Sequence, residues 1–344
     1  RTHPHPLASP MLALARAPFP RRLLAAGVAC GLAALPRPAD AAAAQGPATA
    51  PAPGKLKLAL LQISVGSDKA ANLEHAERKI REAAGCGAKL ICLPECFNSP
   101  YGASFFPAYA EEIPETAAAA TEAAHPSTCM LIRVARQLGV YLVGGSIPEV
   151  DRATGNVYNC NVVVSPDGEI VCKHRKVHLF DIDVPGKITF RESDTLTAGD
   201  QLSLFDTPWG RVGVGICYDI RFPQYAHLLR LSGAHLLLYP GAFNMTTGPL
   251  HWELLARARA VDNQAFVAVP SPARDPNAGY QAWGHSSVID PWGKVVATTE
   301  HEEAIVYAEV DLAEVDTPRQ SIPVFDQKRD DLYTLKWTNA RGGS

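Results

Sequence analysis

The sequence has little charge and no long apolar run, and each shortage argues against a class of function. Only 19% of the 344 residues are charged, and the formal net charge is −3. Nucleic-acid phosphates are bound by clustered Lys and Arg, so this mildly acidic balance argues against a nucleic-acid partner. The longest apolar run, residues 23–35, is too short to cross a bilayer, and we therefore expect no membrane-spanning segment.

The usual motifs of metal and nucleotide binding are also missing. Cys92 and Cys96 lie four residues apart, but no second Cys or His pair follows at zinc-finger spacing. The eight cysteines are scattered through a chain long enough to build a core without disulfides, so we interpret them as reduced thiols. The glycine-rich segments 144–145 and 213–215 lack the spacing and the following Lys of a phosphate-binding loop, which argues against nucleotide binding.

Residues 1–54 differ in composition from the rest of the chain. They are dominated by Ala and Pro and contain five Arg but a single acid, Asp40, which gives this segment a charge of +4. An Arg pair, the apolar run and four alanines follow one another, as in targeting segments with a small-residue cleavage region. We therefore predict an organellar destination, a chloroplast rather than a mitochondrion, with removal of the segment. The alternative is an unprocessed, disordered extension of a cytoplasmic protein.

From Lys55 onward, apolar strand patterns alternate with helix patterns, and the alternation occurs twice. This order predicts an α/β fold with weak two-fold internal symmetry over residues 55–333. We expect Val315–Tyr333 to be an extended tail and residues 334–344 to be disordered. The predicted strands are 55–63, 88–93, 140–144, 157–165, 169–178, 211–216, 234–239, 264–269, 287–289 and 294–298, and the predicted helices are 72–84, 127–138, 224–232 and 251–262.

Cys217 follows the predicted strand 211–216 and stands just before a predicted helix. A thiol at a strand-to-helix turn lies near free helix N–H groups, which lower its pKa and can stabilise an oxyanion. A free Cys is more often a small buried hydrophobic residue, however, so its own neighbourhood leaves both readings open.

Two further side chains are found at the ends of predicted strands. Glu95 follows residues 90–94, where partial burial would make its carboxylate a useful general base. Lys176 shares one face of its strand with His174 and His178 and could stabilise an oxyanion. A solvated strand end and a solvated basic edge are the structural alternatives, and His178 is a competing base for Cys217 in a Cys–His scheme.

The order Glu95, Lys176, Cys217, with about 80 and about 40 residues between them, resembles the nitrilase superfamily of carbon–nitrogen hydrolases. The resemblance covers residues 55–333 and implies a four-layer α-β-β-α sandwich with internal pseudo-two-fold symmetry. It is carried by the motifs Leu-Pro-Glu-Cys-Phe (93–97), His-Arg-Lys-Val-His-Leu-Phe-Asp (174–181) and Gly-Ile-Cys-Tyr-Asp-Ile-Arg-Phe-Pro (215–223).

Four further segments, 98–102, 183–190, 239–249 and 256–263, look like the omega-amidase branch of this superfamily. Members of that branch cleave the terminal amide of 2-oxoglutaramate and 2-oxosuccinamate. A sister branch that hydrolyses deaminated glutathione, or another carbon–nitrogen hydrolase, is the alternative. A non-catalytic scaffold is a third alternative, which the intact triad argues against.

The resemblance implies a role for each matching residue. Cys217 attacks the amide carbonyl, and Glu95 moves the proton. Lys176 and the backbone N–H of Tyr218 stabilise the oxyanion, while Glu192 orients Lys176 and the substrate.

The resemblance also bears on ligands and partners. The carboxylate of a small substrate requires an anchor, for which Arg221, Tyr101 and Thr246 are candidates. The resemblance implies no metal or organic cofactor, and it implies a homodimer or a larger homo-oligomer.

Overall fold

The computed structural model describes residues 53–338. Along its strands, successive side chains point alternately into two apolar layers. In β1 (Lys55–Gln62), Leu58 and Leu60 are buried between two sheets, whereas Ala59 and Leu61 are buried beneath helices. This strand therefore has two buried faces, which explains why it reads as a continuous apolar run rather than as an alternating one. Residues 1–52 and 339–344, with most of the targeting segment and the end of the predicted disordered terminus, lie outside the described residues.

Two sheets are formed with the same sequence of pairings. The first has the order β15-β1-β2-β3-β5-β4, with β6 paired to β5, and the second has the order β9-β10-β11-β12-β13-β14. In both, the pairings along the order are antiparallel, parallel, parallel, antiparallel and antiparallel. This repetition confirms the internal pseudo-two-fold symmetry.

The strands of the first sheet are β1, Leu90–Cys92 (β2), Tyr141–Val143 (β3), Ile147–Val150 (β4), Val157–Val164 (β5), Ile170–Arg175 (β6) and Ala304–Asp311 (β15). Those of the second are Ser203–Thr207 (β9), Gly210–Val214 (β10), Leu236–Leu238 (β11), Phe266–Val269 (β12), Ser287–Ile289 (β13) and Val295–Thr298 (β14). Asp181–Val184 (β7) and Ile188–Arg191 (β8) pair as a separate hairpin.

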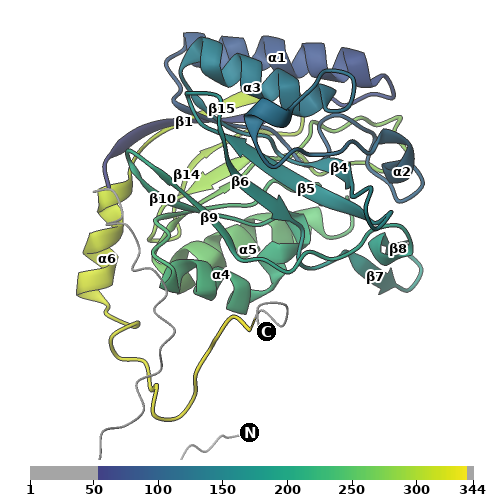
Figure 1. Cartoon of the computed structure of the whole chain (residues 1–344). Helices are drawn as coiled ribbons and strands as arrows, with labels where there is room; N and C mark the ends of the chain where they lie inside the picture. Colours follow the sequence, from purple (N-terminus) through teal and green to yellow (C-terminus); the bar gives the residue numbers. More distant parts are fainter. Residues whose placement is uncertain (1–52, 339–344) are drawn as a thin grey trace, which may run out of the picture. The chain divides into compact units, whose positions relative to one another are not determined.

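Helices cover the outer face of each sheet, as Figure 1 shows. The helices α1 (Lys69–Gly85) and α3 (Pro126–Leu138) pack on the first sheet, and α4 (Pro223–Leu231) and α5 (Gly248–Asn263) pack on the second. A third apolar cluster fills the space between the two sheets. Three apolar layers between four layers of secondary structure confirm the predicted α-β-β-α sandwich.

The C-terminal segment differs from the predicted extended tail. Residues Leu312–Val315 form a 3₁₀ turn (η4), and Asp316–Ser321 form the short helix α6. The Gln264 amide donates to the carbonyls of Pro318 and Ile322, so the helix is held against its own chain. No local sequence pattern could predict these long-range hydrogen bonds.

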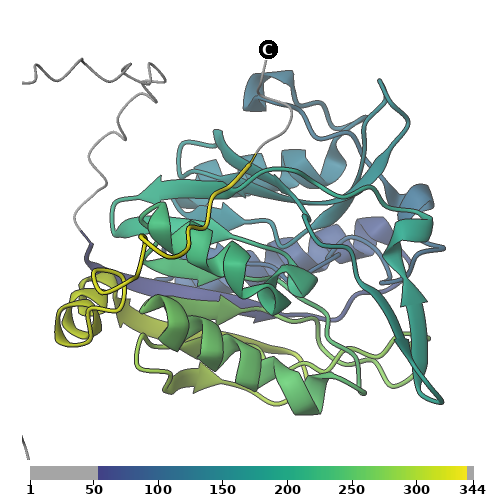
Figure 2. The same cartoon turned by 90° about the horizontal axis from the view of Figure 1, so that it is seen from below.

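Beyond α6, the chain crosses α4, as the yellow segment in Figure 2 shows. Phe325 stacks on His227 with ring centroids 4.7 Å apart. The Trp337 ring lies 6.1 Å from that of Tyr225, so residues 334–338 also reach the second helical layer. The remaining short elements are Phe106–Tyr109 (α2) and the 3₁₀ turns Ala117–Ala119 (η1), Glu192–Asp194 (η2) and Cys217–Arg221 (η3).

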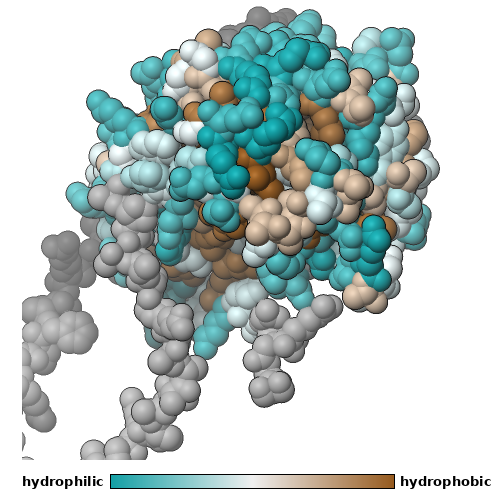
Figure 3. Space-filling view, turned by 45° about the horizontal axis from the view of Figure 1, so that its top comes forward, coloured by the Kyte–Doolittle hydropathy of each residue, from teal (hydrophilic) through white to brown (hydrophobic). Residues whose placement is uncertain are grey.

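The described residues contain no helix that is both long and apolar enough to span a bilayer. On the face in Figure 3, apolar side chains lie in patches among hydrophilic ones, which is usual for a globular protein. All cysteines between residues 53 and 338 are free thiols.

Candidate active site

Glu95 lies at the carboxyl end of β2, on a turn fixed by the loop after β3. The Ser146 hydroxyl accepts from the Cys96 N–H at 3.0 Å, and the Ser146 carbonyl accepts from the Phe97 N–H. A Cβ at Gly145 would lie 1.9 Å from the Pro94 carbonyl oxygen, so only glycine permits this approach. Gly145, one of the two glycines that lack phosphate-loop spacing, therefore permits the turn that positions the Glu95 carboxylate.

Three donors hold the fully buried carboxylate of Glu95. Its Oε1 accepts from the Asn159 amide at 2.8 Å and from Lys176 Nζ at 3.0 Å. Its Oε2 accepts from the backbone N–H of Ala242, which lies in the second half of the chain. Both halves of the pseudo-symmetric fold thus fix this one side chain.

Lys176 lies just past the end of β6 and bridges two carboxylates. Its Nζ is 3.0 Å from Glu95 Oε1 and 2.9 Å from Glu192 Oε1, and all three side chains are fully buried. Glu192 is fixed in turn by the Tyr101 hydroxyl at 2.8 Å and the Phe180 N–H at 2.7 Å. An ammonium group has three N–H donors, so one remains for a ligand.

Cys217 begins the 3₁₀ turn η3, separated from the end of β10 by Gly215 and Ile216, and has a left-handed φ of 45°. This conformation is strained for a residue with a Cβ, and such strain is typical of functional turns. The Cys217 N–H donates to the Pro240 carbonyl at 2.8 Å, and the residue as a whole is 4% exposed. The thiol is close enough to Glu95 to lower the pKa of its carboxyl group, which brings the third predicted residue to the carboxylate.

Burial and charge shift the ionisation of all three groups. Burial raises the pKa of Glu95, an effect that Lys176 opposes and Glu192 reinforces. Burial alone would lower the pKa of Lys176, but Glu192 and Glu95 outweigh it and hold that pKa well above its usual value. Burial and the charge of Glu95 raise the pKa of Cys217, so the resting thiol is protonated and needs an adjacent base.

Asp219 connects the Cys217 turn to the segment after Lys176. It is fully buried and accepts from the His178 N–H at 2.9 Å, and its carboxylate is 2.7 Å from His178 Nδ1 and 3.2 Å from His174 Nε2. Although burial opposes it, these hydrogen bonds keep the pKa of Asp219 below its usual value. The His178 ring also stacks on Phe222 at 3.6 Å. His178 is therefore held by Asp219 rather than offered to Cys217 as a base.

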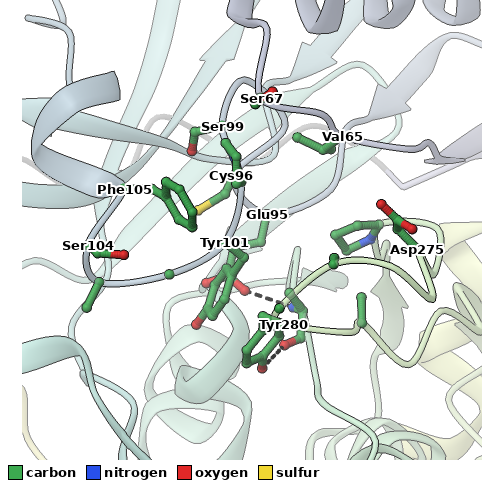
Figure 4. A pocket seen from close by; sticks show the side chains of 18 of the residues that line it. Val65, Ser67, Glu95, Cys96, Ser99, Tyr101, Ser104, Phe105, Asp275 and Tyr280 are labelled. Atoms are coloured by element: carbon green, nitrogen blue, oxygen red, sulfur yellow. Dashed lines mark hydrogen bonds between the residues drawn. The ribbon is translucent and has the colours of Figure 1, made fainter.

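A cavity of about 740 Å³ opens next to Glu95. Figure 4 shows Tyr101 and Tyr280 side by side beneath Glu95, and their ring centroids are 4.5 Å apart. The Tyr280 hydroxyl donates to the Ala242 carbonyl at 2.6 Å, while the N–H of Ala242 donates to Glu95. The two tyrosine rings thus line the pocket while their hydroxyls are already engaged, that of Tyr101 by Glu192 and that of Tyr280 by the Ala242 carbonyl.

The four predicted substrate-binding residues differ in whether they line the cavity. Tyr101 lines the cavity, but its hydroxyl is engaged by Glu192. Arg221 lies close enough to Cys217 and Tyr280 to interact electrostatically with both. The Tyr218 ring packs against Phe180 at 5.2 Å, while its N–H is in the first turn of η3. Arg221, Tyr218 and Thr246 are not among the residues that line the cavity, and the Thr246 N–H donates to Asn244 Oδ1.

The sequence interpretation missed three residues that position Glu95, namely Asn159, Ala242 and Tyr280. Asn159 lies in β5, where an Asn within an apolar strand was the available signal. Ala242 acts through its backbone, and Tyr280 comes from a loop, so neither has a local signature in the sequence.

Comparisons with known proteins identify the family of this chain. Residues 57–320 match the carbon-nitrogen hydrolase family. The chain is 56% identical over 280 residues to the omega-amidase of Homo sapiens, covering 81% of this chain and 97% of that one. It is 57% identical over 281 residues to the chloroplastic omega-amidase of Arabidopsis thaliana, covering 82% and 74% of the two chains.

A solved structure is similar as well. A Saccharomyces cerevisiae member of branch 10 of the nitrilase superfamily has a TM-score of 0.73 and 44% identity, covering 80% of this chain and 97% of that one. Sequence family, fold and an aligned relative thus agree on the predicted superfamily. The chain belongs to the carbon–nitrogen hydrolase family of the nitrilase superfamily.

Proposed function

We propose that this chain is an omega-amidase that hydrolyses the terminal amide of 2-oxoglutaramate and 2-oxosuccinamate. The observation that carries the proposal is the buried Glu95–Lys176–Glu192 cluster, with the thiol of Cys217 close enough to Glu95 for each to shift the pKa of the other. The similarity to omega-amidases at 56–57% identity supports the substrate class.

In the first half of the reaction, Cys217 Sγ attacks the amide carbon while Glu95 takes the thiol proton. The negative charge that develops on the carbonyl oxygen is stabilised by the third N–H of Lys176 and by the backbone N–H of Tyr218. Since the first N–H groups of a helical turn have no intrahelical acceptor, the Tyr218 N–H suits this role. The C–N bond then breaks, and Glu95 returns the proton to the departing ammonia.

In the second half, a water molecule attacks the thioester carbon and gives a proton to Glu95. The C–S bond breaks, the proton returns to Cys217, and the 2-oxo dicarboxylate leaves. Glu192 keeps Lys176 in position throughout, since it contacts the Nζ atom that faces Glu95. Glu95 thus acts as a base and then as an acid in each half, which suits a carboxylate whose pKa is raised by burial.

Arg221 is the proposed anchor for the substrate carboxylate. Among residues 53–338 no carboxylate forms an ion pair with it, and its Nε has no hydrogen-bond partner. Its guanidinium lies over the Phe243 ring at 4.7 Å. A half-buried cation without an anionic partner is suited to a carboxylate ligand, which it can bind in a bidentate manner.

Ammonia release from three amides tests the proposal. The purified chain is expected to prefer 2-oxoglutaramate and 2-oxosuccinamate over deaminated glutathione by kcat/KM, and Cys217→Ala is expected to be inactive. A preference for deaminated glutathione would assign the chain to the sister activity, and an inactive wild type would indicate the scaffold alternative.

We also propose that residues 1–54 direct the chain to the chloroplast. The charge of +4 and the similarity to a chloroplastic relative support this destination. A fluorescent protein fused behind residues 1–54 should enter plastids in a plant cell. Uptake into mitochondria or retention in the cytoplasm would contradict the proposal.

A homodimer through α5 is the proposed assembly. Leu250, Leu254 and Val261 are more than half exposed and recur at spacings of four and seven, which places them on one side of the helix. An apolar row of this kind on an outer helix favours burial against a second copy, since homodimers use self-complementary patches.

A further inference from the structure

A cluster of metal-ligating side chains lies outside the catalytic cavity, where the segment before β13 meets the turn between β14 and β15. It consists of His285, Glu300 and His301, whose nitrogen and oxygen ligand atoms all lie within 4.8 Å of one another. His285 Nδ1 is 3.9 Å from Glu300 Oε2, and a further carboxylate oxygen, Glu302 Oε1, is 3.3 Å from His301 Nε2. The proposed reaction uses none of these groups.

One buried amide fixes both segments that carry the cluster. The Nε2 of Gln62 donates to the carbonyls of Glu300 and Glu302, both at 2.7 Å. Its Oε1 accepts from the N–H and the hydroxyl of Ser286, both at 2.9 Å. Because Gln62 is fully buried in β1, the two segments are held from within the core and not by surface contacts.

The backbone conformation at residues 284 and 285 permits the close approach of the two segments. Gly284 has a φ of 78°, and a Cβ there would lie 2.7 Å from His301 Cα. The next residue, His285, also has a left-handed φ of 58°, and its N–H donates to the Glu300 carbonyl at 3.0 Å. Such a conformation is uncommon for a residue with a side chain and is maintained only where its surroundings require it.

Contacts with two tryptophans orient His285. Its ring stacks on Trp283 with centroids 4.3 Å apart, and its carbonyl accepts from the Trp252 indole at 2.8 Å. The nearby cation, Arg274, donates to the carbonyls of Ala282 and Trp283.

We propose that His285, Glu300 and His301 bind Zn²⁺ or a similar transition-metal ion, with Glu302 as an adjacent carboxylate. Two imidazoles with a carboxylate suit Zn²⁺ rather than Mg²⁺ or Ca²⁺, which prefer oxygen ligands alone. The ion would join the β14–β15 turn to the segment before β13. Through the His285 carbonyl it would also fix Trp252, whose ring packs beside Gly241 and Cys217. The proposal is independent of the proposed amidase activity.

Zinc binding to the full chain provides the test. The purified protein is treated with EDTA, exchanged into buffer and titrated with ZnCl₂ in a calorimeter. We expect one equivalent of Zn²⁺ to bind in the wild type and in His75→Asn, a control histidine that is similarly exposed and also pairs with a Glu. Binding should weaken by at least about tenfold in His301→Asn and in Glu300→Gln, because even changes behind the ligands cost 10–100-fold.

Cobalt absorption separates this site from the thiols, and a thermal shift separates binding from unfolding. Co²⁺ bound by imidazole and carboxylate gives visible d–d bands without the thiolate charge-transfer band that a Cys ligand produces. Zn²⁺ should also raise the Tm of the wild type but not that of His301→Asn. His301 is 40% exposed, so its removal should leave the fold intact. Equal binding by wild type and His301→Asn, or a thiolate band with Co²⁺, would overturn the proposal.

Discussion

At the scale of single residues, two carboxylates and one ammonium group share a buried site. Glu95, Lys176 and Glu192 are all fully buried, so their charges interact strongly and leave a net negative site. Burial and the charge of Glu95 raise the pKa of the Cys217 thiol, so a thiolate is disfavoured before attack. We therefore expect Glu95 to remove the Cys217 proton as the sulfur attacks, a transfer that leaves the net charge of the site unchanged.

A pair of substitutions distinguishes Glu95 from His178 as the base. Glu95→Gln is expected to lower kcat/KM by at least about 10³, in the range of a lost general base. His178→Asn should cost no more than about tenfold, because His178 is bound to Asp219 and stacked on Phe222. Ammonia release by both variants checks this, and a larger loss in His178→Asn would favour a Cys–His scheme.

Tyr101→Phe tests whether the Tyr101 hydroxyl positions Glu192 or binds substrate. The hydroxyl donates to a buried carboxylate, and such a bond contributes about 1.5 kcal/mol, so kcat should fall about tenfold with KM nearly unchanged. Steady-state kinetics on 2-oxoglutaramate separate the two constants. A raised KM with an unchanged kcat would restore Tyr101 to the substrate contacts.

At the scale of elements, the turn after β10 and the segment after β6 are joined by one carboxylate. Asp219 contacts His174, His178 and the N–H of Ile216, and thereby sets the distance between Cys217 and Lys176. Neither element alone could hold its catalytic side chain, because both residues lie just beyond the regular hydrogen bonds of their strands. The catalytic side chains are thus positioned by contacts between the ends of two strands and not by either strand alone.

Asp219→Asn is expected to destabilise the fold by about 2–4 kcal/mol at pH 7, since it removes a buried charge from two histidine partners. Urea unfolding measures the loss. Asp206→Asn serves as the control, because the Asp206–Arg211 pair is at the surface and should contribute less than about 1 kcal/mol.

The pH dependence of that loss follows from the direction of the shift. The pKa of Asp219 is lower in the folded state than its usual 3.8, so the carboxylate stabilises the fold fully above 3.8. As the pH falls below 3.8 towards the folded pKa, the contribution is lost. The wild type and Asp219→Asn should therefore converge in stability in strong acid, and a constant difference would contradict this linkage.

At the scale of the whole molecule, an apolar row remains on α5 after the sandwich has formed. Leu254 is 63% exposed on a helix whose other side is buried against the second sheet. A charge at this position leaves the core untouched and alters only what packs on the outer face. The row therefore offers a direct test of assembly.

Leu254→Glu should weaken the proposed homodimer by at least about tenfold, since an unpaired buried carboxylate costs several kcal/mol. Light scattering behind size exclusion gives the mass of each species. Val171→Glu is the control, because Val171 is an exposed apolar residue on β6, away from α5. A mass unchanged by Leu254→Glu would place the interface elsewhere.

The catalytic candidates differ in how far local pattern could identify them. Glu95 and Cys217 directly follow apolar strands, and the ends of parallel strands gather at one edge of a sheet. Glu192 had no local signal beyond a loop and was selected through the resemblance alone. Asn159 and Ala242 escaped selection because their contribution is one hydrogen bond each to a residue more than 60 positions away.

The sequence by itself determined the α/β class, the strand–helix alternation and the superfamily, because these depend on local periodicity and on short motifs. Only the tertiary structure decided that β15 completes the first sheet beside β1, about 250 residues away. It also placed Lys176 between two carboxylates and bound His178 to Asp219 instead of Cys217. The physical reason is that these pairings depend on strand order and burial, which long-range packing sets and neighbouring residues do not encode.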